Sequence, residues 1–163
     1  MPLWDSADGG AGAAIYGYPP SAFYFRVVFG KPSEGLDTSF QEVTGIKSEL
    51  TIEEVIEGGE NRFVHQLPKG VKQSKLVLRR GIANQQSPLV QWCQSILEGT
   101  LSESFEPKLV YVHLLNPTGT PVRSWSFANA YPVSWEVESF ESSKNQVAIE
   151  KIELSYNYSK REL

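Results

Sequence analysis

The sequence predicts a mainly β protein, an antiparallel β-barrel or sandwich that carries one amphipathic α-helix. Two observations predict this fold class. Most of the chain after residue 20 divides into short runs rich in β-branched and aromatic residues, and these runs are separated by turns that contain Gly, Pro or Asn. Only one segment, at about residues 87–98, shows apolar side chains at helical spacing. Many strands with a single helix favour an antiparallel sheet with a helical cover.

The first 20 residues differ in composition from the rest of the chain. They are rich in Gly and Ala and end in Pro19-Pro20, so we expect an extended N-terminal arm over residues 1–20. The remainder predicts one domain over residues 21–160, which includes a hairpin at about residues 49–63. With 163 residues, of which 40% are hydrophobic and 21% charged, the chain is long enough for one ordinary core.

The strands are expected over residues 23–30, 40–45, 50–55, 62–67, 75–80, 108–115, 122–127, 133–138 and 146–156. The first two end at glycines. The third and fourth flank Gly58-Gly59, which can supply the positive φ of a hairpin turn. In the fifth, Leu76, Leu78 and Arg80 share one face because side chains alternate along a strand.

One helix is expected between a start signal and a stop signal. Ser87 can cap it, Pro88 suits the first helical position, and Gly99 follows its end. Its apolar residues fall on one stripe, which is expected to lie on the sheet. The stripe consists of Leu89, Trp92, Cys93, Ile96 and Leu97.

The last expected strand changes phase. Val147 and Ile149 are odd-numbered, whereas Ile152 and Leu154 are even-numbered. Because one face of a strand keeps one parity, the change predicts either a bulge near Glu150-Lys151 or burial of both faces at different points.

Residues that could carry chemistry are few and isolated. His65 and His113 lie within expected strands without a Cys, Asp or Glu at metal-ligand spacing, and a strand histidine is the simpler interpretation. Cys93 lies on the apolar stripe, which favours a buried small hydrophobe over a nucleophile. We find no phosphate-binding or nucleophile-elbow motif and no run long enough for a membrane span. We therefore expect a non-enzyme with no catalytic residue, no cofactor and no metal.

Charge is strongly segregated in the middle of the chain. Residues 49–60 contain five glutamates and no base, and residues 61–81 contain six Lys or Arg side chains and no acid. Three interpretations stay open: a solvated hairpin whose arms neutralise each other, a nucleic-acid-binding surface, and contacts between copies of the chain. The net charge of −4 argues against general nucleic-acid binding, and no sequence-specific nucleic acid is expected as a partner.

Several pieces of sequence follow one another in a characteristic order: GGENR, LPKG, a basic strand that ends in RRG, the helix SPLVQWCQSIL, and PVSW before the final strand. In this order they resemble the tail tube protein family of contractile phage tails. The resemblance extends to tube proteins of extracellular contractile injection systems of the antifeeding-prophage and virulence-cassette kind. It covers about residues 18–158.

The resemblance implies a tail-tube-like, ring-forming β-barrel similar to the type VI secretion tube protein. Six copies would close into a ring, and rings would stack into a hollow tube. The hairpin would contact a neighbouring subunit, with its acidic arm against the basic block of that neighbour. The residues that this implies for the inter-subunit interface are Glu49, Ile52, Glu53, Val55, Ile56, Glu57, Lys69, Lys72, Lys75, Arg79 and Arg80.

The partners implied by the resemblance are other copies of the chain, a sheath protein, baseplate and spike proteins, and effector cargo or DNA in the lumen. Assembly in the cytoplasm would precede release of the particle or its anchoring to a membrane. Because the arm is longer than a plain tube subunit needs, a specialised ring that starts the tube at the baseplate is the alternative. A monomeric β-barrel that binds an anionic ligand through residues 69–80 is a further alternative.

Overall fold

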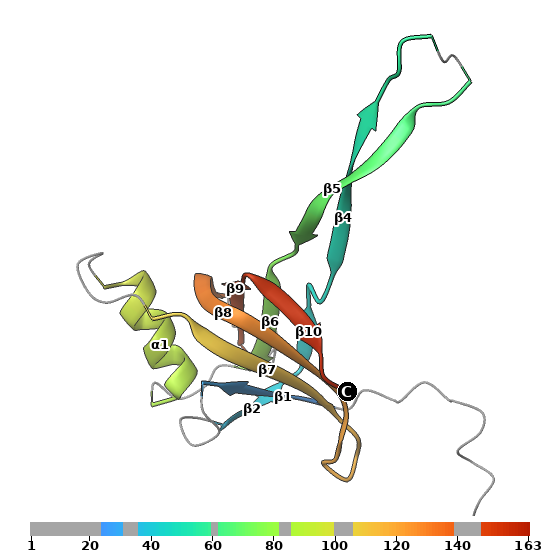
Figure 1. Cartoon of the computed structure of the whole chain (residues 1–163). Helices are drawn as coiled ribbons and strands as arrows, with labels where there is room; N and C mark the ends of the chain where they lie inside the picture. Colours follow the sequence, from blue (N-terminus) through green and yellow to red (C-terminus); the bar gives the residue numbers. More distant parts are fainter. Residues whose placement is uncertain (1–23, 31–35, 60–61, 82–85, 100–105, 139–147) are drawn as a thin grey trace, which may run out of the picture.

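The fold is an eight-stranded antiparallel sheet that curls into a barrel, with one helix packed against it and a two-stranded hairpin that projects from it (Figure 1). The computed structural model describes residues 24–30, 36–59, 62–81, 86–99, 106–138 and 148–163. The arm expected over residues 1–20 lies outside these ranges. The predicted fold class, mainly β with antiparallel strands and one amphipathic helix, is confirmed.

The sheet has the strand order β2-β1-β7-β8-β9-β6-β3, and β10 pairs with β8 beside this path. Strands β4 and β5 form the separate hairpin. The bounds of the strands are β1 Tyr24–Phe29, β2 Leu36–Phe40, β3 Glu42–Thr44, β4 Ser48–Val55, β5 His65–Gln73, β6 Leu76–Gly81, β7 Lys108–Leu115, β8 Pro121–Val137, β9 Ile149–Ser155 and β10 Tyr158–Arg161.

The two ends of the strand order meet through the chain itself. β2 and β3 stand at opposite ends of the sheet, yet only Gln41 separates them in sequence. The Gln41 backbone N–H donates to the Arg79 carbonyl oxygen at 2.9 Å, which ties this link to β6. Because consecutive residues join the first and last strands, the sheet must close on itself, and this closure leaves little of its edge open.

β8 is one strand of 17 residues where the sequence predicts two. The prediction was wrong because Asn129 and Pro132 look like turn residues. Asn129 does adopt a positive φ of 52°, and the pairing with β9 shifts between Pro132 and Ser134. These irregularities bend the strand without ending it. As a result, β8 pairs with β7 along its first half and with β9 along its second half.

The helix is confirmed at the predicted place. α1 spans Pro88–Leu97, and Leu89, Val90, Trp92 and Cys93 are buried against the barrel. The rings of Trp92 and Phe29 lie 5.5 Å apart between centroids, so the helix packs on β1 as well as on β8. No helix in the described part of the chain has the length and hydropathy needed to cross a membrane.

The phase change of the last strand has a different cause from the predicted bulge. The register of β9 against β6 is continuous from Ile149 to Leu154, so β9 has no bulge in the described residues. Its buried side chains are Glu150, Ile152 and Leu154, all even-numbered. The alternation of apolar residues suggested a change of face because the inward position 150 is occupied by a charged residue, Glu150, instead of an apolar one.

Glu150 is buried because Arg80 is buried beside it. Arg80 is 1% exposed and Glu150 is 2% exposed, and the Arg80 Nε donates to a Glu150 carboxylate oxygen at 2.9 Å. The other carboxylate oxygen accepts from Trp135 Nε1 at 2.6 Å, and Arg80 also donates to the Ser87 hydroxyl at 3.0 Å. The guanidinium lies 5.1 Å from the centre of the Phe40 ring. One polar network thus joins β2, β6, β8, β9 and the start of α1.

Replacing one partner of this pair should be far more damaging than replacing a partner of a half-exposed ion pair on the same strand. Arg80→Met leaves the Glu150 carboxylate buried without its counter-charge, and we expect the free energy of unfolding to fall by about 3–5 kcal/mol. Arg79→Met, on the outward face of the same strand, should cost about 0–1 kcal/mol. Chemical denaturation of the variants measures both values. Arg80→Met/Glu150→Gln should lose less than Arg80→Met alone, because Gln still accepts from Trp135; an equal or larger loss would contradict this account.

Burial also controls the reactivity of the cysteine. Desolvation in the core, and secondarily the Glu150 charge, raise the pKa of the Cys93 thiol to about 12. Since the thiolate is the reactive form, we expect a disulfide-exchange reagent to leave the native protein unmodified at mildly alkaline pH. The same reagent should react fully in denaturant. Rapid labelling of the native chain would show that α1 detaches readily from the barrel.

Candidate functional site

The β4–β5 hairpin projects from the barrel, and among the described residues it meets the barrel at its base (Figure 1). At the base, the Ser74 N–H donates to the Lys47 carbonyl oxygen at 3.3 Å, and the Ser48 hydroxyl donates to the Gln73 side chain at 2.9 Å. Gly45 has a φ of 85°, and a Cβ there would lie 1.8 Å from the Lys75 carbonyl oxygen. The two arms can therefore leave the barrel this close together only because residue 45 is a glycine.

The second arm of the hairpin is longer than predicted. It begins at His65 rather than residue 62 and continues to Gln73 rather than residue 67, because Pro68 and Gly70 do not end it. Proline is tolerated in a strand at an edge or a bulge, and β5 has both features: its register against β4 shifts beside Pro68. The predicted turn is confirmed at Gly59, which has a φ of 102°.

One face of the hairpin is apolar. Residues opposite each other in an antiparallel pair project to the same face, and Leu50 pairs with Val71 while Ile52 pairs with Pro68. Leu50 is 59% exposed and Val71 is 61% exposed, and every residue of β4 is exposed. We call Leu50, Ile52, Pro68 and Val71 the apolar face. Towards the tip, Ile56 is 79% exposed. An exposed apolar surface of this kind is typical of a contact site.

The other face of the hairpin carries pairs of opposite charge. Glu49 lies opposite Lys72 in the register and also accepts from Lys47 at 2.7 Å. Nearer the tip, Glu53 lies 3.7 Å from Lys69. The acidic and basic arms therefore compensate each other within one copy, which is the solvated-hairpin interpretation of the charge blocks. The hydrogen bond from Lys47 lowers the pKa of Glu49, so this charge persists at neutral pH and is lost only as the pH falls into the acidic range.

The predicted interface residues divide into two groups. Eight lie on the hairpin, and they are Glu49, Ile52, Glu53, Val55, Ile56, Glu57, Lys69 and Lys72. The other three lie at the barrel and are engaged there. Lys75 bonds Glu153 at 3.3 Å, and Arg79 contacts Glu42 at 3.3 Å and also Glu138.

Arg80 requires a correction. The sequence-based prediction placed it at the surface between subunits, but its side chain is buried and paired with Glu150 of the same chain. The strand alternation puts it on the inward face with Leu76 and Leu78, and this alternation was visible in the sequence. Arg80 is therefore not available for a contact on the surface of this chain.

Three residues of the apolar face were missing from the prediction: Leu50, Pro68 and Val71. Leu50 alternates with Ile52 along the sequence, and this signal could have identified it. Val71 could not be placed beside it from sequence alone, because the bulge in β5 shifts the register by one residue.

The two histidines of the described chain have one polar or acidic neighbour each. His113 Nδ1 and the Ser124 hydroxyl are 2.6 Å apart on neighbouring strands, and burial together with the nearby Arg26 charge lowers the pKa of His113. His65 lies 3.7 Å from Glu57 on the hairpin. Within the described ranges, no group of three His, Cys, Asp or Glu side chains is arranged to hold a metal ion.

Solved structures share this fold. A chain in the cryo-EM structure of the anti-feeding prophage baseplate is 29% identical, with a TM-score of 0.74, and the match covers 89% of this chain and 96% of that one. A chain of the PVC sheath-tube complex, an extracellular contractile injection system, is 23% identical, with a TM-score of 0.73 over 89% of this chain and 92% of that chain. Hcp1 from Flavobacterium johnsoniae is 13% identical, with a TM-score of 0.55 over 86% of this chain and 95% of that one, and it shares the fold alone.

No curated protein sequence matches the chain. The family model of the T4-like virus tail tube protein gp19 matches residues 21–160, which comprise nearly all of the barrel and the hairpin. This match covers most of the chain and agrees with the likeness to the solved structures. The chain belongs to the T4-like virus tail tube protein gp19 family.

Proposed function

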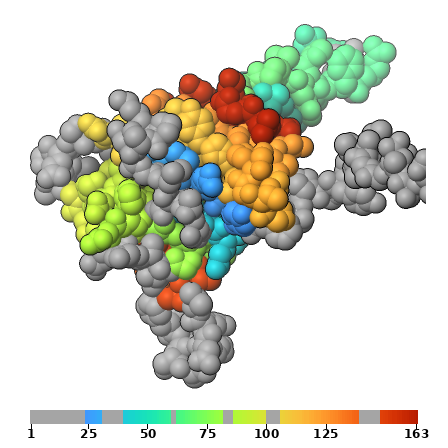
Figure 2. All heavy atoms as spheres, turned by 90° about the horizontal axis from the view of Figure 1, so that it is seen from below, coloured from blue at the N-terminus to red at the C-terminus, as the bar shows by residue number. Residues whose placement is uncertain are grey.

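We propose that this chain is the structural subunit of the inner tube of a contractile injection system or phage tail. Six copies close into a ring, and stacked rings form a hollow conduit for effector or DNA delivery. The observation that carries the proposal is the hairpin, which stands clear of the barrel (Figure 2). It has an exposed apolar face, and within the described residues the outer edges of β4 and β5 pair with no other strand. A hairpin of two strands is at best marginally stable by itself, so a neighbouring copy is needed to cover it.

The position of this surface supports ring formation. The hairpin and the barrel are different patches of the chain, so a contact between the hairpin of one copy and the barrel of the next is head-to-tail. Head-to-tail contacts close into rings or continue as filaments, and a tube combines both. The six-fold count draws on the anti-feeding prophage baseplate, whose structure is described as 6-fold symmetrised.

The same assembly requires further partners. A sheath around the tube and baseplate and spike proteins at its end are the partners we propose, because similar chains come from a baseplate and from a sheath-tube complex. Effector cargo would occupy the lumen. The particle would assemble in the cytoplasm and act after release or from a membrane anchor.

A second candidate role is a ring that starts the tube at the baseplate. The solved structure with 29% identity is that of a baseplate, whereas the sheath-tube complex gives 23%. Electron microscopy of the purified full-length chain separates the two roles. A repeating subunit should give rods of uniform width, and a starting ring should give single rings. A chain that stays monomeric across concentration and salt would overturn both roles and favour the anionic-ligand module.

The apolar face should be needed for assembly but not for folding of the barrel. Ile52→Asp places a charge on that face, where a contact would have to desolvate it, so we expect rings and rods to be lost. Sedimentation velocity measures the assembly, and circular dichroism verifies the barrel. Thr51→Asp adds the same charge one residue away, on the opposite face of β4, and should assemble like the wild type.

The tip offers an independent variant. Ile56→Asp alters the most exposed apolar side chain of the hairpin and should prevent stacking of rings while the barrel still folds. Tubes of ordinary length from Ile52→Asp or Ile56→Asp would contradict the role given to the hairpin.

A further inference from the structure

The two edges of the projecting hairpin are not equivalent. β5 carries Pro68, which has no N–H, and a bulge beside it, and both features prevent regular pairing along its outer edge. β4 runs from Ser48 to Val55 without a proline, and it pairs with no strand other than β5 in the described chain. Its outer backbone N–H and C=O groups are therefore open to an incoming strand, and β4 is the edge of the hairpin that can extend a sheet.

A second open edge lies at the end of the chain. β10 pairs with β8 along one side, and no described strand pairs with its other side. β10 is a short strand at the surface, and its Tyr158 is 60% exposed. Figures 1 and 2 show β10 at the side of the barrel from which the hairpin projects. A strand that is exposed and half paired is a template for another strand.

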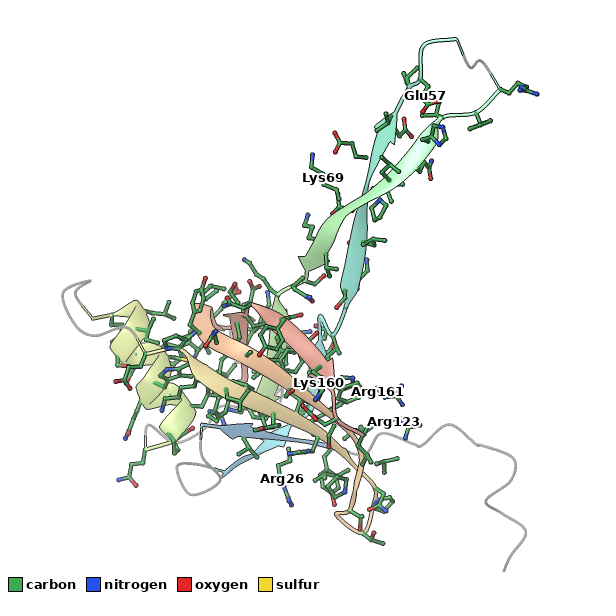
Figure 3. The ribbon with its side chains drawn as sticks, in the orientation of Figure 1. Arg26, Glu57, Lys69, Arg123, Lys160 and Arg161 are labelled. Carbon is green, nitrogen blue, oxygen red and sulfur yellow. The ribbon has the colours of Figure 1, made fainter. Side chains whose placement is uncertain are left out.

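The two open edges carry opposite charges. β4 has three glutamates, and Glu54 has no ion-pair partner among the residues that the structure describes. β10 has Lys160 and Arg161, which Figure 3 shows beside Arg123 at one end of the barrel. Arg161 donates to a Leu163 oxygen at 3.2 Å, and Lys160 lies 3.7 Å from Glu162 at the surface. By composition β4 is therefore acidic and β10 is basic, so the two open edges carry opposite net charges.

The apolar side chains of the two strands are complementary as well. Ile52 is half exposed on β4, and Tyr158 is exposed on β10. Aromatic and β-branched side chains in adjacent strands form favourable cross-strand pairs. Together, open backbone groups, opposite charges and exposed apolar side chains define one occupant for the β4 edge.

We propose that the open edge of β4 in one copy pairs with the open edge of β10 in a neighbouring copy. This inference rests on the proposed self-assembly and specifies which strands form the contact. It differs from the sequence-based expectation, in which the acidic arm meets the block at residues 69–80. That block is compensated within its own copy, because Lys69, Lys75 and Arg79 have acidic partners there.

Charge reversal with mixing tests the pairing. The first variant is Glu53→Lys/Glu54→Lys, which has a basic β4 and a basic β10. The second is Lys160→Glu/Arg161→Glu, which has an acidic β4 and an acidic β10. Each variant alone places like charges together and should stay unassembled where the wild type assembles. An equimolar mixture should recover assembly, because every contact between the two variants joins opposite charges.

A control separates this contact from a general effect of net charge. Glu98→Lys/Glu106→Lys changes the net charge as much as the first variant does, but at exposed sites just after α1 and just before β7. It should assemble alone. If circular dichroism shows that either double variant fails to fold, the mixing experiment can be repeated with the single variants Glu54→Lys and Arg161→Glu. The side chains of Glu54 and Arg161 have no oppositely charged side-chain partner in the described ranges, so these changes break no ion pair between side chains there.

The outcomes distinguish the pairing from the proposed function. A wild-type chain that stays monomeric overturns the proposed function. If the wild type assembles, two results overturn only the β4–β10 pairing. In the first, each charge-reversal variant assembles alone as well as the wild type does; in the second, the mixture of the two variants fails to assemble.

The choice of edge has its own test. Pro68 has no N–H to donate to β4, so Pro68 and Ile52 form a pair whose backbone nitrogens both point away from the partner strand. Backbone direction repeats every two residues along a strand, so the N–H of Glu54 also points to the outer edge of β4. Glu54→Pro then removes an outward donor from the β4 edge, and we expect assembly to be lost. Gln66→Pro removes one opposite it, from the edge already blocked by Pro68, and should assemble. The reverse result would assign the contact to β5. Glu54→Gln, which keeps the N–H, reports the loss of charge alone.

Discussion

The buried pair between Arg80 and Glu150 is the interaction on which the arrangement of this molecule depends. Two charges can remain in the core only when they satisfy each other, so β6 and β9 must be adjacent and in one register. That register fixes which side chains of both strands face inward. The same network reaches Trp135 on β8 and Ser87 at the start of α1, so it also sets the helix on the barrel.

The register of β6 in turn places the hairpin. β6 begins just after the Gly45–Lys75 crossing, where the absence of a Cβ lets the two arms approach. β3 and β6, which precede and follow the hairpin, pair with each other in the barrel, so the two arms leave the barrel side by side. The barrel therefore buries its apolar side chains and pairs most of its strands, whereas the hairpin that projects from it leaves apolar side chains and strand edges exposed. This contrast suits a subunit whose hairpin becomes complete only against other copies.

Charge has a different role in this hairpin from the one that its segregation along the sequence implies. Once the arms pair, Glu49 lies opposite Lys72 and Glu53 lies 3.7 Å from Lys69, so these charges are compensated within the copy. Such exposed pairs contribute little to stability, but they keep the hairpin in register. Apolar side chains and backbone edges are left as the groups that need a partner. In the proposed pairing of β4 with β10, burial and main-chain pairing would drive association, and charge would select the correct strand.

The sequence by itself determined the fold class, the helix, the hairpin turn at Gly59 and the family resemblance, because these depend on local composition and on the order of short motifs. Alternation within β6 was also sufficient to place Arg80 inward with Leu76 and Leu78, although the charge of Arg80 suggested a surface site. The tertiary structure decided the rest. The length of β8, the strand β10, the position of Glu150 and the pairing of Leu50 with Val71 all depend on which strands become neighbours. The sequence of a strand shows only that alternate residues face the same way. The strand or side chain that pairs with a buried charge, or that accommodates a bulge, lies far away in the chain and cannot be identified from the local pattern.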